Sequence, residues 1–317
     1  MMKCYYRTPQ GLHILDTIEA LQALPSYDHV VWIDLLKPTP QETQTIENLF
    51  ALVVPTPQES QEIEISSRYW EEADQIKINS YFLIGVDGAP HNETVSFILK
   101  GDLLMSARYE ELRSFDEFNK RLWSAPRLYE NGFAIFCHIL NIRIDIDADT
   151  IENLTKEISK MRKNLFAEAE KEHNTLLKKI AHFEDFSAKI RENLTDKQRI
   201  LSSLLKSTLY ETHNSDIPIM LNDLSSLIEH TNFNFERLDY LQNIFIGMVS
   251  ITQNKTIKIF TIVNVIFLPP TLIASIYGMN FVLMPELGWK YGYLLSVGMM
   301  LFSSVLPLYI FRKKGWM

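Results

Sequence analysis

Three consecutive residues near the C-terminal end of the chain, Gly278, Met279 and Asn280, offer neutral oxygen atoms to a cation. Asn280 carries a side-chain carbonyl, and the main-chain carbonyls of Gly278 and Met279 lack partners if a helix ends there. These oxygens can bind the water shell of a dication that dehydrates reluctantly, whereas a carboxylate would hold the ion too firmly for release. Gly278 also suits a C-terminal helix cap, a role compatible with ion binding.

Polar residues recur along the segment that precedes this tripeptide. At 100° per residue they fall within a sector of roughly 100° on a single helix. Within an apolar stretch, polar side chains face protein or water rather than lipid. These residues therefore either line a water-filled pore or form hydrogen bonds between packed helices. The pore-lining candidates are Asn243, Ser250, Asn254, Thr261, Asn264, Thr271 and Ser275.

Apolar residues share the same sector. Ile257 and Leu268 lie within it, and Phe260 lies near its edge. Rings of apolar side chains can block ions by dewetting when a helical bundle narrows, so these three are candidates for a hydrophobic gate. Ordinary packing between helices is an equally good interpretation of all three.

Two uncharged apolar segments must position these residues. Residues 259–280 and 291–311 contain no Asp, Glu, Lys, Arg or His, and only the loop 281–290 separates them. A membrane-spanning helix needs ~20 apolar residues, so the sequence predicts a transmembrane hairpin, TM1 and TM2. A buried hairpin in a soluble protein is the alternative. The charge asymmetry around the hairpin argues against that alternative.

Basic residues flank the hairpin on one side. Lys255 and Lys258 precede the first span, and Arg312, Lys313 and Lys314 follow the second. The connecting loop carries only one acidic and one basic residue. Because Lys and Arg accumulate on the cytoplasmic side, we expect a protein of the cytoplasmic (inner) membrane with both termini in the cytoplasm.

A long helix is predicted between the soluble part and the hairpin. Pro218 suits its first turn, and Ser215 or Asp216 suits its cap. No breaker follows before the first span. A helix from Asp216 to Tyr277 is about 90 Å long, too long for one domain to bury, which implies a bundle of identical helices in a homo-oligomer. Asp149 or Thr150 is predicted to cap an earlier long helix. Asp145, Asp147 and Asp149 are then read as a solvated approach to that cap.

The N-terminal part alternates strand-like and helical segments. Residues 29–35, 81–86 and 94–99 are predicted strands, and Thr39 with Pro40 marks a helix start. The expected fold is therefore a cytoplasmic α/β domain with a mixed sheet, then long stalk helices, then the transmembrane hairpin. The predicted domains are residues 1–124, 125–258 and 259–317, the last including a basic C-terminal tail.

Composition excludes several classes of function. The net charge is −8 at pH 7 and no long basic run lies away from the hairpin, so nucleic acid is not an expected partner. There is no Gly-rich phosphate-binding loop, so no nucleotide is expected either. No hydrolase or metalloprotease motif is present, and we expect no enzyme activity. Cys4 and Cys137 fit a reducing cytosol.

The hairpin tip resembles that of the CorA-type magnesium channels. The shared features are Gly278-Met279-Asn280 at the end of the first of two spans, the basic tail, and the loop residues Met284, Pro285, Glu286 and Leu287. The resemblance implies a homopentamer in the lipid bilayer that forms a cytoplasmic funnel. It also implies a water-filled pore for hydrated Mg²⁺. Because no ATP site is visible, we expect uptake to be passive and driven by the membrane potential. Co²⁺ or Ni²⁺ remain alternative substrates, because hydrated divalent ions are similar in size. Pro270, which forms a Pro-Pro pair, and the neutral Asn243 depart from the family pattern.

The resemblance also implies regulation by Mg²⁺ bound between acidic residues of cytoplasmic domains. The sequence cannot pair these residues. The candidate regulatory metal ligands are Asp216 and Asp223 on the stalk, and Glu71, Glu72 and Asp74 in the α/β domain.

Two other functions remain open. A ZntB-type zinc transporter shares the hairpin but couples transport to protons, and the Met-Pro-Glu-Leu loop favours the magnesium type instead. The second is a membrane-anchored coiled-coil scaffold or sensor without a pore. In that class, changing the polar stripe would leave ion flux unchanged because no flux exists.

Overall fold

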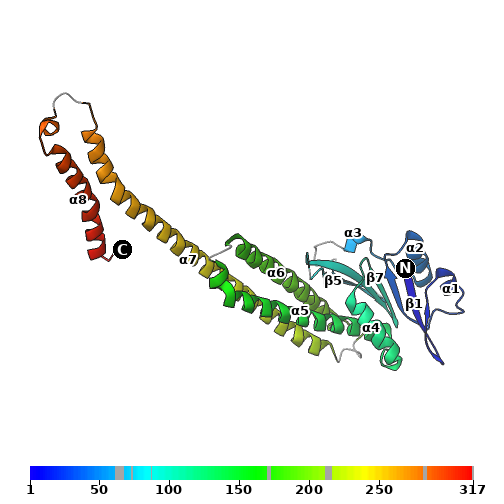
Figure 1. Ribbon diagram of the computed structural model, residues 1–317. Coiled ribbons are helices and arrows are strands. Elements are labelled where there is room, and N and C mark those ends of the chain that lie inside the picture. Colours follow the sequence, from blue (N-terminus) through cyan, green and yellow to red (C-terminus); the bar gives the residue numbers. More distant parts are fainter. Residues whose placement is uncertain are drawn as a thin grey trace. The chain divides into compact units, whose positions relative to one another are not determined.

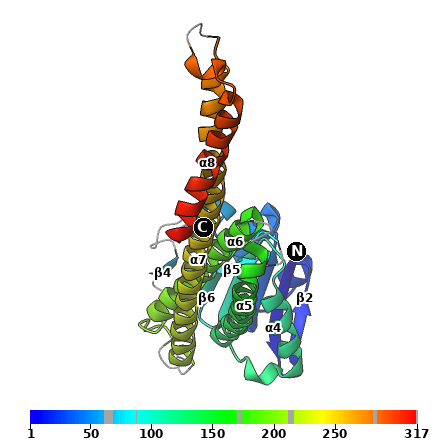
Figure 2. The same ribbon diagram turned by 60° about the vertical axis from the view of Figure 1, so that its left-hand side comes forward.

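The computed structural model describes residues 1–60, 68–72, 74–86, 88–169, 173–210, 216–280 and 284–315 (Figures 1 and 2). By their internal contacts these residues form two units, Met1–Gln242 and Asn243–Met317. The boundary between the units falls inside the longest helix, α7, which runs from Ile217 to Tyr277.

A seven-stranded sheet forms the centre of the first unit, with strand order β2-β1-β3-β7-β6-β5-β4. Strands β3 and β7 pair in parallel and the other recorded pairs are antiparallel, so the predicted mixed sheet is confirmed. The predicted strands 29–35, 81–86 and 94–99 lie mainly in β3, β5 and β6, although β5 ends at Ile84. The strands are β1 Met2–Thr8, β2 Gly11–Leu15, β3 Val30–Leu36, β4 Tyr69–Glu72, β5 Gln75–Ile84, β6 His91–Lys100 and β7 Leu103–Arg108.

Two helices, α1 (Ile18–Gln22) and α2 (Pro40–Phe50), cover one face of this sheet. Leu21 and Ile46 from these helices are fully buried in one apolar cluster with strand residues such as Ile33. Helix α2 begins as predicted, because the Thr39 side chain accepts from the amide of Glu42 and Glu42 accepts from the amide of Thr39. A short helix, α3 (Pro57–Ser60), follows.

The other face of the sheet carries α4 (Arg113–Ser124), α5 (Gly132–Ala169) and α6 (His173–Leu204), with a single 3-10 turn, η2 (Pro126–Leu128), between α4 and α5. Aromatic rings fill this interface. Trp32 of β3 lies 5.4 Å from Phe118 of α4, and Phe97 of β6 lies 5.1 Å from Phe136 of α5, measured between ring centroids. Such pairs add to the stability gained from burial alone.

Helix α5 begins at Gly132, so the predicted start at Asp149 or Thr150 is wrong. A Cβ atom on Gly132 would lie 2.2 Å from the amide nitrogen of Leu104, which explains the glycine at the point where α5 meets the sheet. Thr150 lies inside the helix, and its hydroxyl donates to the Ile146 carbonyl at 2.8 Å. Local capping preference is therefore overridden by contacts made elsewhere.

Asp147 is fully buried. The prediction that it belongs to a solvated approach to a helix cap is therefore wrong. It pairs with Arg143 one turn earlier on α5, accepts from the Asn193 side chain of α6 at 3.2 Å, and lies 3.9 Å from the Lys197 ammonium. Both cationic side chains also bond to main-chain carbonyls of β5. Arg143 donates to the Leu83 carbonyl at 3.0 Å, and Lys197 donates to the Tyr81 carbonyl. This buried network joins α5, α6 and β5.

Stability should depend on pH through Lys197. Burial lowers the pKa of Lys197 from 10.5 to about 8, although Asp147 acts in the opposite direction. Between pH 8 and 10.5 the folded chain therefore releases a proton that the unfolded chain retains, and the contribution of this group to stability rises with pH. Lys197→Met should remove that slope. Urea midpoints of both proteins in detergent test this, and a difference between them that stays constant across the window would contradict it.

The second unit consists of the distal part of α7, the turn η4 (Pro285–Gly288) and α8 (Gly292–Lys313). Helix α7 is continuous from Ile217 to Tyr277 with Pro218 in its first turn, so the predicted long helix is confirmed. Both α7 and α8 contain windows long and apolar enough to cross a membrane, and these windows are almost wholly exposed on a single chain.

Candidate ion pathway

Helix α7 ends at the predicted ion-binding tripeptide. Gly278 donates its amide to Ala274 at 2.9 Å and Met279 donates to Ile276 at 3.3 Å, after which the helical pattern stops. Among the described residues, no donor reaches the main-chain carbonyls of Gly278 and Met279, and none reaches the side-chain carbonyl of Asn280. All three residues are exposed. Their oxygens are thus available to water or an ion at the end of the helix.

Gly278 does not form the left-handed helix cap that glycine often provides, because its φ is not positive. Its space is nevertheless restricted. A Cβ atom at this position would lie 3.0 Å from the Ala274 carbonyl oxygen of the last helical turn. A close approach of the backbone, rather than a positive φ, accounts for glycine here.

The Met-Pro-Glu-Leu segment forms a tight turn directly before α8. Pro285 opens η4, and the amide of Leu287 donates to the Met284 carbonyl at 3.2 Å. The Glu286 carbonyl oxygen lies close to the start of α8. A Cβ atom added to Gly292 would be only 2.2 Å from this oxygen. Residues 281–283 of the predicted outer loop lie outside the described residues.

The predicted pore-lining residues all lie on α7 and are exposed on a single chain. Where these residues carry hydroxyls on the apolar segment, their recorded bonds go to their own helix: Thr261 donates to Ile257 at 2.8 Å and Thr271 to Phe267 at 2.6 Å. Across residues 216–280 and 284–315, none of the seven bonds to α8. Hydrogen bonding across helices would therefore need a second copy of the chain. The gate candidates Ile257, Phe260 and Leu268 are 58%, 66% and 65% exposed.

The Pro-Pro pair lies inside α7, and a carbonyl that it leaves without its usual helical bond has a partner on α8. Pro270 has no amide proton, so the Ile266 carbonyl loses its usual partner four residues later. Ser304 of α8 donates its hydroxyl to this carbonyl at 3.2 Å. A missing bond follows from the proline itself, but its replacement cannot be read from the sequence, because the Ser304 hydroxyl comes from a separate helix. A neighbouring hydroxyl is one way in which membrane helices tolerate proline.

The candidate regulatory carboxylates of the α/β domain already have partners within the chain. Glu71 accepts from Ser207 at 3.1 Å, Glu72 pairs with Lys77 at 3.0 Å, and Asp74 pairs with Lys100 at 3.2 Å. All three carboxylate residues are exposed. An ion binding there would have to compete with these intrachain contacts.

The stalk candidates have different neighbours. Asp216 adds to the effect of burial in raising the pKa of the Cys137 thiol to about 12. Burial raises the pKa of Asp145, and Asp149 and Asp223 add to that effect. The described residues contain no group of three or more His, Cys, Asp or Glu side chains able to hold a metal ion. None of the five predicted regulatory carboxylates therefore belongs to such a group in the described part of a single chain.

Comparisons with known proteins agree with this architecture. The family described as "CorA-like Mg2+ transporter protein" matches residues 27–313. A Wolinella succinogenes protein named "Magnesium transport protein CorA" is 41% identical over 97% of this chain and 98% of its own length. The structure of the CorA magnesium transporter from Methanocaldococcus jannaschii has a TM-score of 0.82 at 22% identity, covering 100% of this chain and 99% of that one.

The fold alone does not separate the magnesium type from the zinc type. The ZntB cytoplasmic domain from Vibrio parahaemolyticus covers 78% of this chain and 97% of its own with a TM-score of 0.56, but at only 14% identity. The sequence matches extend over both the soluble part and the two apolar helices, and the Wolinella succinogenes relative carries the magnesium name. The chain is a member of the CorA-like Mg²⁺ transporter family, which consists of transporters and not enzymes.

Proposed function

We propose that this protein is a divalent-cation channel for passive Mg²⁺ uptake across the cytoplasmic membrane. The observation that carries the proposal is the uninterrupted helix α7, which bears an exposed polar stripe and ends at the exposed oxygens of Gly278, Met279 and Asn280. The name of the Wolinella succinogenes relative supports Mg²⁺ as the transported ion. Co²⁺ and Ni²⁺ are further substrates that a site for hydrated dications would accept.

The oxygens at the end of α7 act on the hydrated ion. Mg²⁺ keeps its water shell because dehydration is slow and costly, so recognition uses hydrogen bonds from bound water to the tripeptide carbonyls and Asn280. The neutral site binds weakly enough for release. Farther along, the side chains from Ser275 to Asn243 offer hydroxyl and amide groups to the same water shell. The exposed apolar residues Ile257, Phe260 and Leu268 narrow the path and gate it by dewetting.

Several copies must surround such a path. One α7 presents a polar stripe and apolar flanks to solvent on a single chain, and the polar stripe has no stable place in lipid without partners. We propose a homopentamer in the bilayer, with both termini in the cytoplasm. The basic residues at the end of α8 and before the apolar part of α7 support this orientation.

Feedback by intracellular Mg²⁺ is part of the proposal. The carboxylates Glu71, Glu72 and Asp74 of one copy would bind the ion together with Asp216 or Asp223 of a neighbour. The exposure of all five residues on a single chain supports binding between copies rather than within one. Bound Mg²⁺ would hold neighbouring cytoplasmic domains together and keep the path closed.

Substrate identity separates this proposal from proton-coupled zinc transport. Purified protein in liposomes should take up Mg²⁺, reported by a trapped Mg²⁺ dye, at a rate unaffected by a pH gradient. Protein-free liposomes serve as the control. Absence of a Mg²⁺ signal, together with Zn²⁺ entry that depends on the pH gradient, would contradict the proposal. Absence of flux of either ion would favour the scaffold or sensor.

A further inference from the structure

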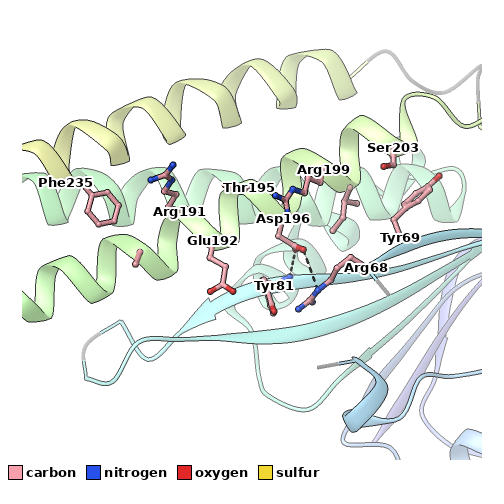
Figure 3. A pocket seen from close by; sticks show the side chains of 12 residues that line it. Arg68, Tyr69, Tyr81, Arg191, Glu192, Thr195, Asp196, Arg199, Ser203 and Phe235 are labelled. Atoms are coloured by element: carbon pink, nitrogen blue, oxygen red, sulfur yellow. Dashed lines mark hydrogen bonds and ion pairs between the residues drawn. The ribbon is translucent and has the colours of Figure 1, made fainter. Parts of the chain in front are cut away.

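A pocket in the first unit lies between α6 and the β4–β5 edge of the sheet, far in sequence from the ion pathway. Its volume is ≈ 800 Å³, within the range of small-molecule sites. Figure 3 shows the side chains that line it. The α6 residues recur every three or four positions and so share one face of the helix. The lining residues are Arg68, Tyr69, Tyr81, Ala188, Arg191, Glu192, Thr195, Asp196, Arg199, Ile200, Ser203 and Phe235.

Arg68 is the residue of this pocket that indicates a ligand. The residue is only 8% exposed, yet neither terminal nitrogen of its guanidinium has a hydrogen-bond partner among the residues that the structure describes. Its position is fixed, because its carbonyl accepts from the Asn79 amide at 2.9 Å and its guanidinium carbon lies 3.7 Å from the centre of the Tyr81 ring. A buried guanidinium with free N–H groups needs acceptors, and none of the described residues supplies them.

The carboxylates of the pocket are committed to other groups. Asp196 accepts from the Tyr81 amide at 2.9 Å and the Ser80 hydroxyl at 3.2 Å, and it meets Arg68 only through Nε, at 4.0 Å. Glu192 accepts from the Asn92 side chain at 3.1 Å. Figure 3 shows the ion pair of Arg68 with Asp196. The two terminal nitrogens of Arg68 have no hydrogen-bond partner among the described residues.

Two further arginines extend the positive charge. Arg191 and Arg199 are exposed, and among the described residues no carboxylate lies within ion-pair distance of either. They are two helical turns apart on α6, about 12 Å along its axis, with Arg68 held against Asp196 between them. Among the described residues, two guanidinium groups without an ion pair and a third whose terminal nitrogens are unbonded stand out in a chain whose net charge is −8. Their spread fits several linked anionic groups better than one.

We propose that this pocket binds a small polyphosphate-bearing anion. Guanidinium groups bind phosphate through paired N–H···O bonds, and Arg68 would offer its two free nitrogens to one phosphate while Arg199 and Arg191 bind others. Tyr69, Tyr81 and Phe235 also line the pocket, so the base of a nucleoside could stack on one of these rings. No Gly-rich loop takes part, which is why the sequence predicts no nucleotide. The proposal is independent of ion transport.

Calorimetric titration of the full chain in detergent, in a buffer without divalent cations, tests the site. Tripolyphosphate should bind saturably with one site per chain, and orthophosphate and citrate should bind at least about tenfold more weakly. ATP tests whether an aromatic ring of the lining accepts a base: tighter binding than tripolyphosphate would identify a nucleoside phosphate as the ligand, and equal binding would identify the polyphosphate alone. Absence of saturable binding of every probe would overturn the proposal.

Variants locate the binding. Arg199→Gln changes an exposed residue and should weaken tripolyphosphate binding about tenfold, and Arg68→Gln should abolish it. The control is Arg113→Gln, which removes the same charge from an arginine that is 72% exposed on α4. Equal losses in the Arg113 and Arg199 variants would overturn the proposal in favour of nonspecific attraction. Mg²⁺ uptake by the Arg199 variant should stay at the wild-type rate, so the two proposals fail separately.

Discussion

Asn280→Ala should abolish Mg²⁺ uptake while the protein still assembles in liposomes. The substitution removes the only side-chain oxygen of the tripeptide at the end of α7. A hydrogen bond to one copy is worth about 1 kcal/mol, and a ring of about five copies loses all of them together, so uptake should fall by ~10³-fold. Asn280→Asp should also reduce uptake, because a ring of charges would hold the ion too firmly for release.

A matched control separates this effect from general damage to α7. Asn222 lies on the same helix, is exposed, and belongs to the first unit rather than the candidate pathway. Asn222→Ala should therefore transport Mg²⁺ at the wild-type rate, measured with the same trapped dye at equal protein density. Mg²⁺ uptake by Asn280→Ala at the rate of this control would remove the tripeptide from the mechanism.

Asp147→Ala should give the largest loss of stability in the first unit. The substitution leaves Arg143 and Lys197 buried without their counter-charge, and breaking a buried ion pair in this way costs about 3–5 kcal/mol. That is a large part of the ~5–15 kcal/mol that stabilises a typical domain. The urea midpoint of the full chain in detergent should fall sharply, and α5 and α6 should exchange amide protons faster.

Glu152 provides the comparison on the same helix. It pairs with Lys156 one turn later, but both side chains are about two-thirds exposed, at 64% and 65%. Glu152→Ala should therefore change stability by less than ~0.5 kcal/mol. Equal midpoints for the two variants would show that the buried network does not hold α5 and α6 to the sheet.

Local sequence signals predicted much of the fold. Thr39, Pro40 and Glu42 define the start of α2 through bonds within four residues of one another, and the structure contains both bonds. Helix α7 was predictable because no breaker occurs between Pro218 and the first span, and the long uncharged segments predicted the apolar part of α7 and α8.

The rest depended on residues distant in sequence. Asp149 carries a capping preference, yet α5 continues past it, because the helix is held by contacts such as that of Asp147 with Asn193, 46 residues later. The Arg68 pocket requires β4, β5 and α6 to come together, and no spacing along the chain shows this. The bond from Ser304 to the carbonyl freed by Pro270 likewise joins two helices.

The dependence of Mg²⁺ uptake on membrane potential tests the central claim most directly. Liposomes that contain the wild-type protein and no ATP would be given a series of inside-negative potentials, with the trapped dye reporting the initial rate. A dication gains about 4.6 kcal/mol per 100 mV on entering a negative interior, so a passive channel should take up Mg²⁺ faster at each more negative potential. Uptake that is unaffected by the potential, or that needs a proton gradient, would contradict the account.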